Sequence, residues 1–209
     1  MGLKELIELK QLKTLSLHGT KVSDLRDLKE LKQLSRLDLS ITKLTDTGMK
    51  ELEQLKQLTS LDISATNITD AGLKALKDHK QLEQLDISFN NVTDAGLKEL
   101  KELKQLIFLD LSKTRIGDPG IKELKELKQL RSLDMHTTRV GDIGLKELKE
   151  CTQLTSLNLD TTLVTDEGLK ELKGLKQLEE LDLSSTKVTA AGIKQLHKEL
   201  PKCSILKYE

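Results

Sequence analysis

Short apolar segments recur along the whole chain at a nearly constant interval. Each follows the pattern L-x-x-L-x-[LIM], in which apolar and polar positions alternate with the period of two that a β-strand requires. The first interval is 22 residues and the next six are 24 residues each. A degenerate copy begins at Cys203, with Leu206 and Tyr208 in its later apolar positions, and predicts a ninth strand. The eight full copies begin at Leu12, Leu34, Leu58, Leu82, Leu106, Leu130, Leu154 and Leu178.

Between these segments, leucines recur at three-residue intervals, as they do from Leu97 onward, and predict a short helix. Residues 93–96, TDAG, precede this helix and supply a capping side chain. In the next unit we expect Asp118 to be the cap and Pro119 to be the first helical residue, a position that proline favours. A glycine early in each helix is expected where a side chain would crowd the adjacent turn. A coiled coil does not fit, because the spacing is 3-3-3 and a strand interrupts it every 24 residues.

Each unit reads approximately L-x-x-L-D-L-S-x-T-x-[VIL]-T-D-x-G-[LI]-K-E-L-K-x-L-K-Q. This consensus resembles the leucine-rich-repeat superfamily, in particular its short bacterial and ribonuclease-inhibitor-like classes, over essentially the whole chain. The resemblance implies an α/β solenoid, or horseshoe, with a parallel concave sheet and short helices on the convex side. The family usually places Asn at the strand exit as a ladder between turns. Asn90 matches that position, and the Thr residues elsewhere in the column are expected to do similar work.

The repeats predict a single domain over residues 1–209. Residues 1–11 form an N-terminal half repeat, 12–199 the eight repeats, and 200–209 a capping strand. Gly2, Leu3, Leu6 and Leu9 align with the glycine and helix leucines of a full unit, so the chain begins within a repeat. Together with the uniform helices, this start indicates excision from a longer array or consensus-style engineering.

The composition excludes several classes of partner. Lys plus Arg and Asp plus Glu number 34 each, so no net field attracts nucleic acid or an anionic membrane. Cys151 and Cys203 have neither disulfide nor zinc spacing, and are expected to be buried thiols in a reducing compartment. No apolar segment is long enough for a signal or membrane span. We therefore predict a cytoplasmic monomer whose partners exclude nucleic acid and membranes.

The outward positions of the strands are where a partner is expected to bind. Their fifth column contains five consecutive aspartates, from Asp38 to Asp134, on strands that lie about 4.8 Å apart. This aspartate file is either an acidic groove for a basic partner or a structural feature, in which each Asp bonds to a neighbouring Ser or Thr. The candidate partner-binding residues are Arg36, Asp38, Asp62, Asp86, Phe108, Asp110, Asp134, His136, Asp160 and Asp182.

Three of these candidates have a distinct chemistry. His136 and Asp160 are neighbours in the seventh column, and we expect an ordinary contact between them because a third ligand or a nucleophile is missing. Phe108 is the only aromatic residue at the outward positions of the eight full strand segments and a candidate anchor, while Phe89 is expected to lie too far away to join it. The sequence indicates no catalytic residue, cofactor or metal site. It predicts a scaffold that binds a protein or peptide on its concave face, or an engineered or excised scaffold without a natural ligand.

Overall fold

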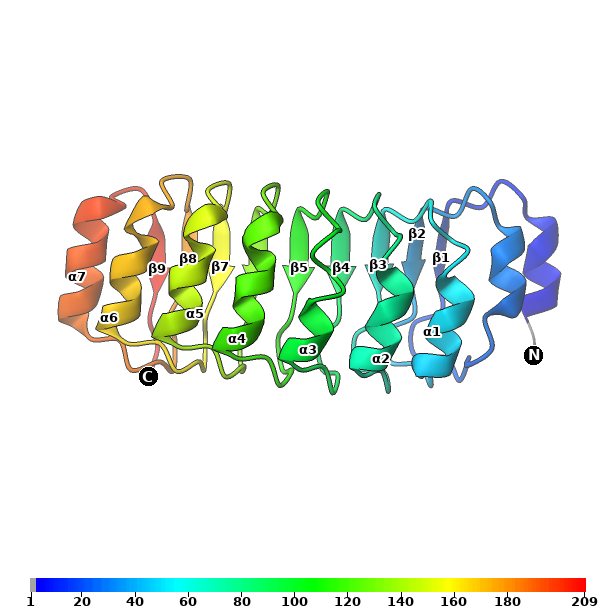
Figure 1. Cartoon of the computed structure of the whole chain (residues 1–209), viewed down its shortest axis with the longest axis horizontal. Helices are drawn as coiled ribbons and strands as arrows, with labels where there is room; N and C mark the ends of the chain where they lie inside the picture. The colour runs from blue at the N-terminus through cyan, green and yellow to red at the C-terminus, as the bar shows by residue number, and fades with distance from the viewer. Residues whose placement is uncertain (1–2) are drawn as a thin grey trace.

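The computed structural model describes residues 3–209, so the alignment of Gly2 lies outside the described residues. Nine parallel strands form one open sheet in the order of the sequence (Figure 1). The strands are β1 Thr14–Ser16, β2 Arg36–Asp38, β3 Ser60–Asp62, β4 Gln84–Asp86, β5 Phe108–Asp110, β6 Ser132–Asp134, β7 Ser156–Asn158, β8 Glu180–Asp182 and β9 Ser204–Leu206. The predicted eight strands and the ninth are confirmed.

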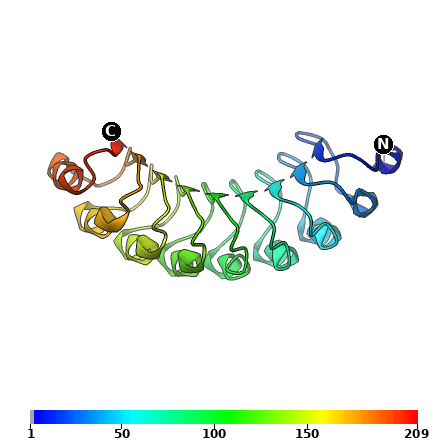
Figure 2. The ribbon, with the colours of Figure 1, turned by 90° about the horizontal axis from the view of Figure 1, so that it is seen from above.

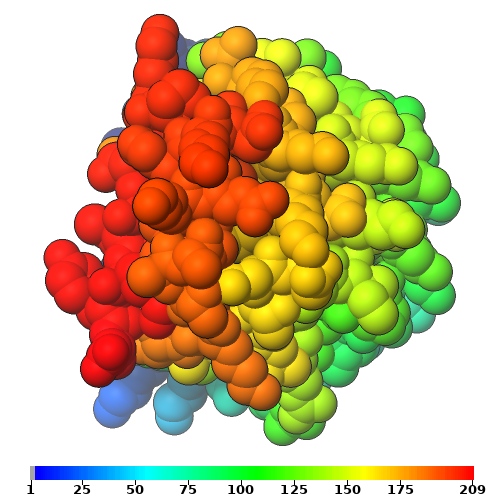
Figure 3. Space-filling view, turned by 90° about the vertical axis from the view of Figure 1, so that its left-hand side faces the viewer, coloured from blue at the N-terminus to red at the C-terminus, as the bar shows by residue number. Residues whose placement is uncertain are grey.

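The sheet is one wall of a curved array. Figure 2 shows the strands on the inside of the arc and the helices on the outside, as the horseshoe prediction requires. Each strand has one central apolar residue. Leu109 of β5 is fully buried between the sheet and the helices, whereas Leu15 of β1 and Ile205 of β9, at the two ends of the sheet, are partly buried. Figure 3 views the array from its C-terminal end, where the last turns cover those behind them. Stacking thus buries an apolar face that no single unit could bury alone.

The helices are short, and many are wound as 3-10 turns. The N–H of Leu100 donates to the carbonyl of Leu97 at 3.0 Å, and that of Leu103 to Leu100 at 2.9 Å. A 3-10 helix has three residues per turn, so a leucine at every third position faces the core. The helical segments are η1 Leu3–Glu8, η2 Arg26–Glu30, α1 Asp46–Leu52, α2 Asp70–Leu73, η3 Lys74–Leu76, α3 Asp94–Leu97, α4 Asp118–Ile121, η4 Lys122–Glu126, α5 Asp142–Glu147, η5 Leu148–Glu150, α6 Asp166–Leu169, η6 Lys170–Gly174 and α7 Ala190–Glu199.

The expected cap at Asp118 is wrong. The residue that caps α3 is Thr93, whose side chain accepts from the N–H of Ala95. In α4 the cap position is held by Gly117, and Asp118 is the first helical residue. The carboxylate of Asp118 is engaged elsewhere, because it accepts the N–H of Gly141 in the following repeat at 2.6 Å.

The same inter-repeat bond recurs along the array and explains the glycine column. Asp94 Oδ1 accepts the N–H of Gly117 at 2.7 Å, and a Cβ built on Gly120 would lie 2.6 Å from that oxygen. The expected packing role of the glycine is confirmed, and what it makes room for is the aspartate of the preceding repeat. The aspartates that bond to the next repeat are Asp46, Asp70, Asp94, Asp118, Asp142 and Asp166.

The threonines at the strand exit do less than predicted. Asn90 Nδ2 donates to the carbonyl of Ile63 in the preceding repeat at 2.8 Å and to Ile87 in its own at 3.2 Å. Thr114 Oγ1, in the same column, donates only within its own repeat, to the carbonyl of Leu111 at 2.6 Å. Thr66 Oγ1, in contrast, also donates to Asn90 Oδ1 of the following repeat at 3.0 Å. A threonine of this column thus joins a contact between two turns where Asn90 supplies the reach, whereas Thr114 does not replace the ladder of Asn.

Two polar residues replace a helix leucine without forming a site. His79 is fully buried and its Nε2 lies 3.1 Å from the carbonyl oxygen of Leu52. Cys151 is also fully buried, with its Sγ 3.6 Å from the carbonyl oxygen of Leu124. Burial lowers the pKa of His79 and raises the pKa of the Cys151 thiol to about 11. His79 is a core residue, and both cysteines of the described chain are free and buried, as expected for the thiols. Within residues 3–209, no helix is long and apolar enough to cross a membrane.

Candidate binding surface on the concave sheet

The aspartate file is a continuous row across five neighbouring strands. The parallel register pairs Asp38 with Asp62, then Asp86, Asp110 and Asp134 in turn. Each of these side chains is partly buried at the end of its strand. Like charges at strand spacing repel by roughly 1 kcal/mol even in a water-like dielectric, so other contacts must hold the row in place.

Those contacts lie in the turn that follows each strand. Asp86 Oδ1 accepts the N–H of Ser88 at 2.8 Å, and Asp110 Oδ1 accepts that of Ser112 at the same distance. Asn158 replaces Asp in this column, and its Oδ1 still accepts the N–H of Asp160 at 3.0 Å. These are the bonds that a structural role of the file requires. Because an amide oxygen serves equally well at Asn158, the negative charge is not needed for the bond.

The carboxylates of the file differ in how easily they ionise. Burial raises the pKa of Asp86 to about 6, and the neighbouring charges of Asp110 and Asp62 add to the effect. Burial likewise raises the pKa of Asp110. At Asp38, burial is outweighed by hydrogen bonds from Ser40 and Ser16, so its pKa is lowered. In the middle of the file, at Asp86 and Asp110, the ionised carboxylates are therefore destabilised, because the groups around them do not compensate their burial.

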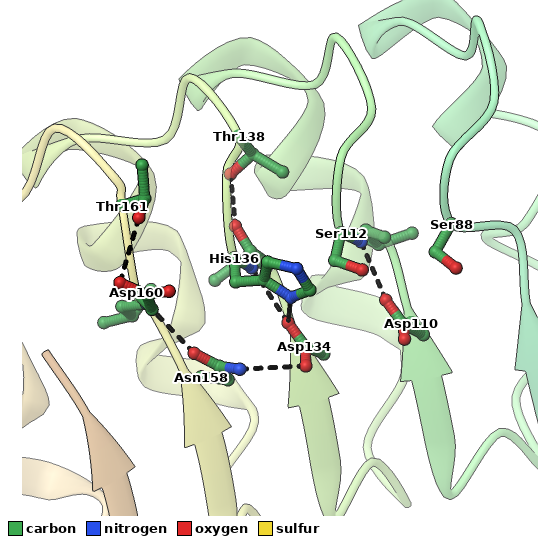
Figure 4. Close-up of polar contacts among 12 residues, drawn as sticks. Ser88, Asp110, Ser112, Asp134, His136, Thr138, Asn158, Asp160 and Thr161 are labelled. Carbon is green, nitrogen blue, oxygen red and sulfur yellow. Dashed lines mark hydrogen bonds and ion pairs between the residues drawn. The ribbon is translucent and has the colours of Figure 1, made fainter. Parts of the chain in front are cut away.

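The expected contact between His136 and Asp160 is wrong. His136 Nδ1 lies 2.9 Å from Asp134 Oδ1 on its own strand, and the backbone N–H of His136 donates to the same oxygen at 2.8 Å (Figure 4). The carboxylate of Asp160 accepts from Thr161 Oγ1 at 2.9 Å. Asp134 also accepts from Asn158 Nδ2 at 3.0 Å, so His136 and Asn158 both orient this end of the file. A residue two positions along the same chain is closer than one on the next strand.

A hollow of about 350 Å³ covers the C-terminal half of the sheet. Phe108 lies at one side of it, partly exposed, and Ser132, Ser156, Asp134 and Asp182 line its floor. The remaining candidates frame the same face. Arg36 is exposed on β2, beside Ser60 of β3. Asp182 accepts the N–H of Ser184 at 2.8 Å, in the same kind of turn as the rest of its column.

A second hollow, of about 500 Å³, lies over the strand ends from β1 to β6. Phe89 lines this hollow and Phe108 lines the other one, in agreement with the prediction that the two rings do not form one patch. Ile41 and Phe89 here expose 56% and 51% of their surface, and Ala65 lies between them. We call these three residues the apolar ridge. The three residues occupy the same position of successive repeats and share a left-handed backbone, with φ of 56°, 50° and 54°, for which the sequence has no signal.

The concave face carries polar and apolar contact groups. Across residues 3–209, no three His, Cys, Asp or Glu side chains gather to hold a metal ion. The pKa of the Cys151 thiol is raised rather than lowered, and the pKa of His79 is lowered by burial in the core, away from the sheet. What the concave face offers is carboxylates, hydroxyl groups and a few exposed apolar side chains.

Comparisons with known proteins agree with this architecture. Two family models described as leucine rich repeat match residues 56–116 and 176–196. No curated protein gives a significant match. Among solved structures, internalin C2 of Listeria monocytogenes is similar with a TM-score of 0.77 and 25% identity, over 93% of this chain and 80% of its own.

Two further structures share the fold. A second Listeria monocytogenes internalin has a TM-score of 0.66 at 21% identity, over 96% of this chain and 68% of that one. A leucine-rich-repeat protein of Leptospira interrogans has a TM-score of 0.73 at 24% identity, over 97% of this chain and 56% of that one. With its repeat consensus, its two family-model matches and its nine-stranded solenoid, this chain has the leucine-rich-repeat fold and is similar to leucine-rich-repeat proteins.

Proposed function

We propose that the chain is an interaction module that binds a protein or peptide on its concave sheet. Leucine-rich-repeat proteins typically mediate protein–protein interaction. The observation that carries the proposal is the concave face itself, where the column of the aspartate file is polar from β1 to β8 and two hollows open over the sheet. Concave surfaces with a few convergent polar groups are the usual form of a binding site.

The chemistry of the surface supports a basic partner. The aspartate file runs along the concave face, and Phe108 supplies an apolar contact beside it. Aromatic side chains are enriched among the residues that dominate interface energies. We propose that the chain acts as a monomeric single domain in the cytoplasm, where its two thiols stay reduced, and that its partner is neither nucleic acid nor membrane.

A pair of matched variants tests the proposal. Ser132→Arg places a long cation on the concave face beside Phe108, and Arg36 occupies the same strand position in β2 without disturbing the sheet. Gln195→Arg adds the same charge on the exposed, convex surface of α7. The parent and both variants are used as baits in pull-downs from bacterial and mammalian lysates.

We expect proteins that the parent and Gln195→Arg retain and that Ser132→Arg loses. If every retained protein binds all three baits equally, binding does not involve the concave face. If no protein is specifically retained by the parent, the chain is a scaffold without a natural ligand, the second hypothesis drawn from the sequence.

A further inference from the structure

In the turn after each of the strands β1 to β8, one residue adopts a left-handed backbone. The φ values of these residues lie between 50° and 66°, a region that glycine enters freely and bulky or β-branched residues avoid. Gly19 shows that glycine fits the column, yet Ile41 and Phe89 place large side chains there at φ of 56° and 54°. Backbone strain kept at a position is a reason to look for a function there. The column is Gly19, Ile41, Ala65, Phe89, Lys113, Thr137, Thr161 and Ser185.

Strain at these positions is accompanied by exposure. Ile41 and Phe89 expose 56% and 51% of their surface, so neither side chain repays the strain by packing into the core. Ile41 follows β2 and Phe89 follows β4, so two strand spacings separate them, roughly 10 Å along the array. The side chains of the apolar ridge are thus available for contact with another molecule.

The apolar ridge lines a hollow that is also lined by carboxylates of the aspartate file. Asp38, Asp62, Asp86 and Asp110 line the same hollow of about 500 Å³ as Ile41 and Phe89. A ligand in this hollow would contact carboxylates and apolar side chains at the same time, which fits a partner that carries both cationic and apolar groups.

The charges around the ridge are also suited to a cation. The ammonium group of Lys113 lies 4.3 Å from the centre of the Phe89 ring, so the ring already accepts a cation at one end of the ridge. Burial and the neighbouring aspartates raise the pKa of Asp86 and Asp110. A bound cation would stabilise their ionised forms and bring both pKa values down again.

We infer that the hollow between the aspartate file and the apolar ridge binds a basic segment of a partner protein, one with an exposed apolar side chain beside its Lys or Arg residues. This inference rests on the proposed function and names the partner class for one end of the concave face. Ile41 and Phe89 supply the apolar anchors, and the carboxylates select the charge.

Three synthetic peptides serve as probes in fluorescence anisotropy titrations. The first is a lysine–serine peptide with two leucines, the second is the same peptide without leucines, and the third is a glutamate–serine peptide with the two leucines. We expect the parent to bind the first peptide about 10-fold more tightly than either of the others, because only this peptide carries both the cationic and the apolar groups. Such a difference in Kd corresponds to about 1.4 kcal/mol. Binding of the first peptide should weaken as salt rises, and also as the pH falls below the pKa of Asp86, about 6.

The decisive variant combines Ile41→Gly with Phe89→Gly. Glycine suits the left-handed backbone, so the thermal midpoint should not fall, while affinity for the first peptide should drop about 10-fold with the loss of the anchors. The matched control combines Ile143→Ser with Leu163→Ser, since these side chains are 70% and 55% exposed but do not line the hollow. The control should bind like the parent.

The inference is overturned if the first peptide fails to bind, if it binds no better than the second or third, or if the glycine variant binds like the parent. An equal loss in the control overturns it too, because the peptide would then respond to exposed apolar groups in general. The proposed function is judged separately by the pull-down. Partners that depend on Ser132 but not on Ile41 and Phe89 would preserve the proposed function and remove this inference.

Discussion

Replacing Asp86 with Asn should make the protein less sensitive to rising pH. The substitution removes a carboxylate from the middle of the aspartate file and leaves an oxygen that can accept the N–H of Ser88, which Asp86 now holds at 2.8 Å. The array already contains this arrangement, since Asn158 accepts the N–H of Asp160 at 3.0 Å in the same column. The variant therefore isolates the charge from the turn that the side chain supports.

The magnitude follows from the shift in pKa. The pKa of Asp86 is about 6 in the folded protein, against an ordinary value of 3.8. The folded state binds the proton more tightly than the unfolded state, so this group's contribution to stability is greatest below pH 3.8 and is lost as the pH rises through 6. Between pH 4.5 and 7.5, linkage with these two values gives a loss of about 2 kcal/mol in the free energy of unfolding.

Urea unfolding at pH 4.5 and 7.5 measures this loss. The parent should lose about 2 kcal/mol more than Asp86→Asn between the two pH values. Asp38→Asn is the control. Hydrogen bonds lower the pKa of Asp38, so its carboxylate is ionised in both the folded and the unfolded state over most of the range from pH 4.5 to 7.5. If the free energies of unfolding of the parent and of Asp86→Asn change in parallel between the two pH values, the ionised carboxylate of Asp86 is not destabilised in the folded protein. The conclusion that the charge in the middle of the file is uncompensated would then be wrong.

Three further substitutions test the packing. Gly120→Ala should cost about 2–4 kcal/mol by urea unfolding, because its Cβ would collide with the aspartate of the preceding repeat, whereas Gly174→Ala, with open space around it, should cost less than about 0.5 kcal/mol. Leu109→Ala, fully buried in β5, should cost roughly 2–5 kcal/mol in the same assay, and partly buried Leu3→Ala much less; equal losses would contradict nearest-neighbour stacking. His79→Leu should raise the thermal midpoint, and increasingly so below pH 6.5. Burial lowers the pKa of His79, so the unfolded state binds the proton more tightly and the parent loses stability as the pH falls. An unchanged midpoint at pH 5.5 would count against this burial penalty.

The repeat period was sufficient to predict the architecture. Eight copies of one apolar pattern determine the strand positions, and polar outward residues indicate an open face. The same pattern did not distinguish α from 3-10 winding, although the three-residue leucine spacing was visible from Leu97 onward. That distinction depends on which backbone hydrogen bonds form, and here those from Leu100 to Leu97 and onward span three residues.

The polar contacts were harder to predict, because they depend on the reach of individual side chains. Asp118 was expected to cap its own helix but bonds to Gly141 of the next repeat. His136 was expected to contact Asp160, but its own strand offers Asp134 at a shorter distance. The left-handed backbone at Ile41 has no signal in its own residue type, because isoleucine disfavours it.

The coupling between one repeat's aspartate and the next repeat's glycine has a consequence for how such an array changes length over evolution. The carboxylate of Asp94 accepts the N–H of Gly117 and packs against Gly120 in the following unit. In the same way Gly96, in the unit of Asp94, packs against Asp70 of the preceding unit. Each unit thus carries one half of the contact on either side. Duplication or loss of a whole 24-residue unit brings an aspartate and a glycine together again at the new junction, so the array can change length without leaving a carboxylate unpaired. A substitution in the aspartate column alone, or in the glycine column alone, disrupts the contact.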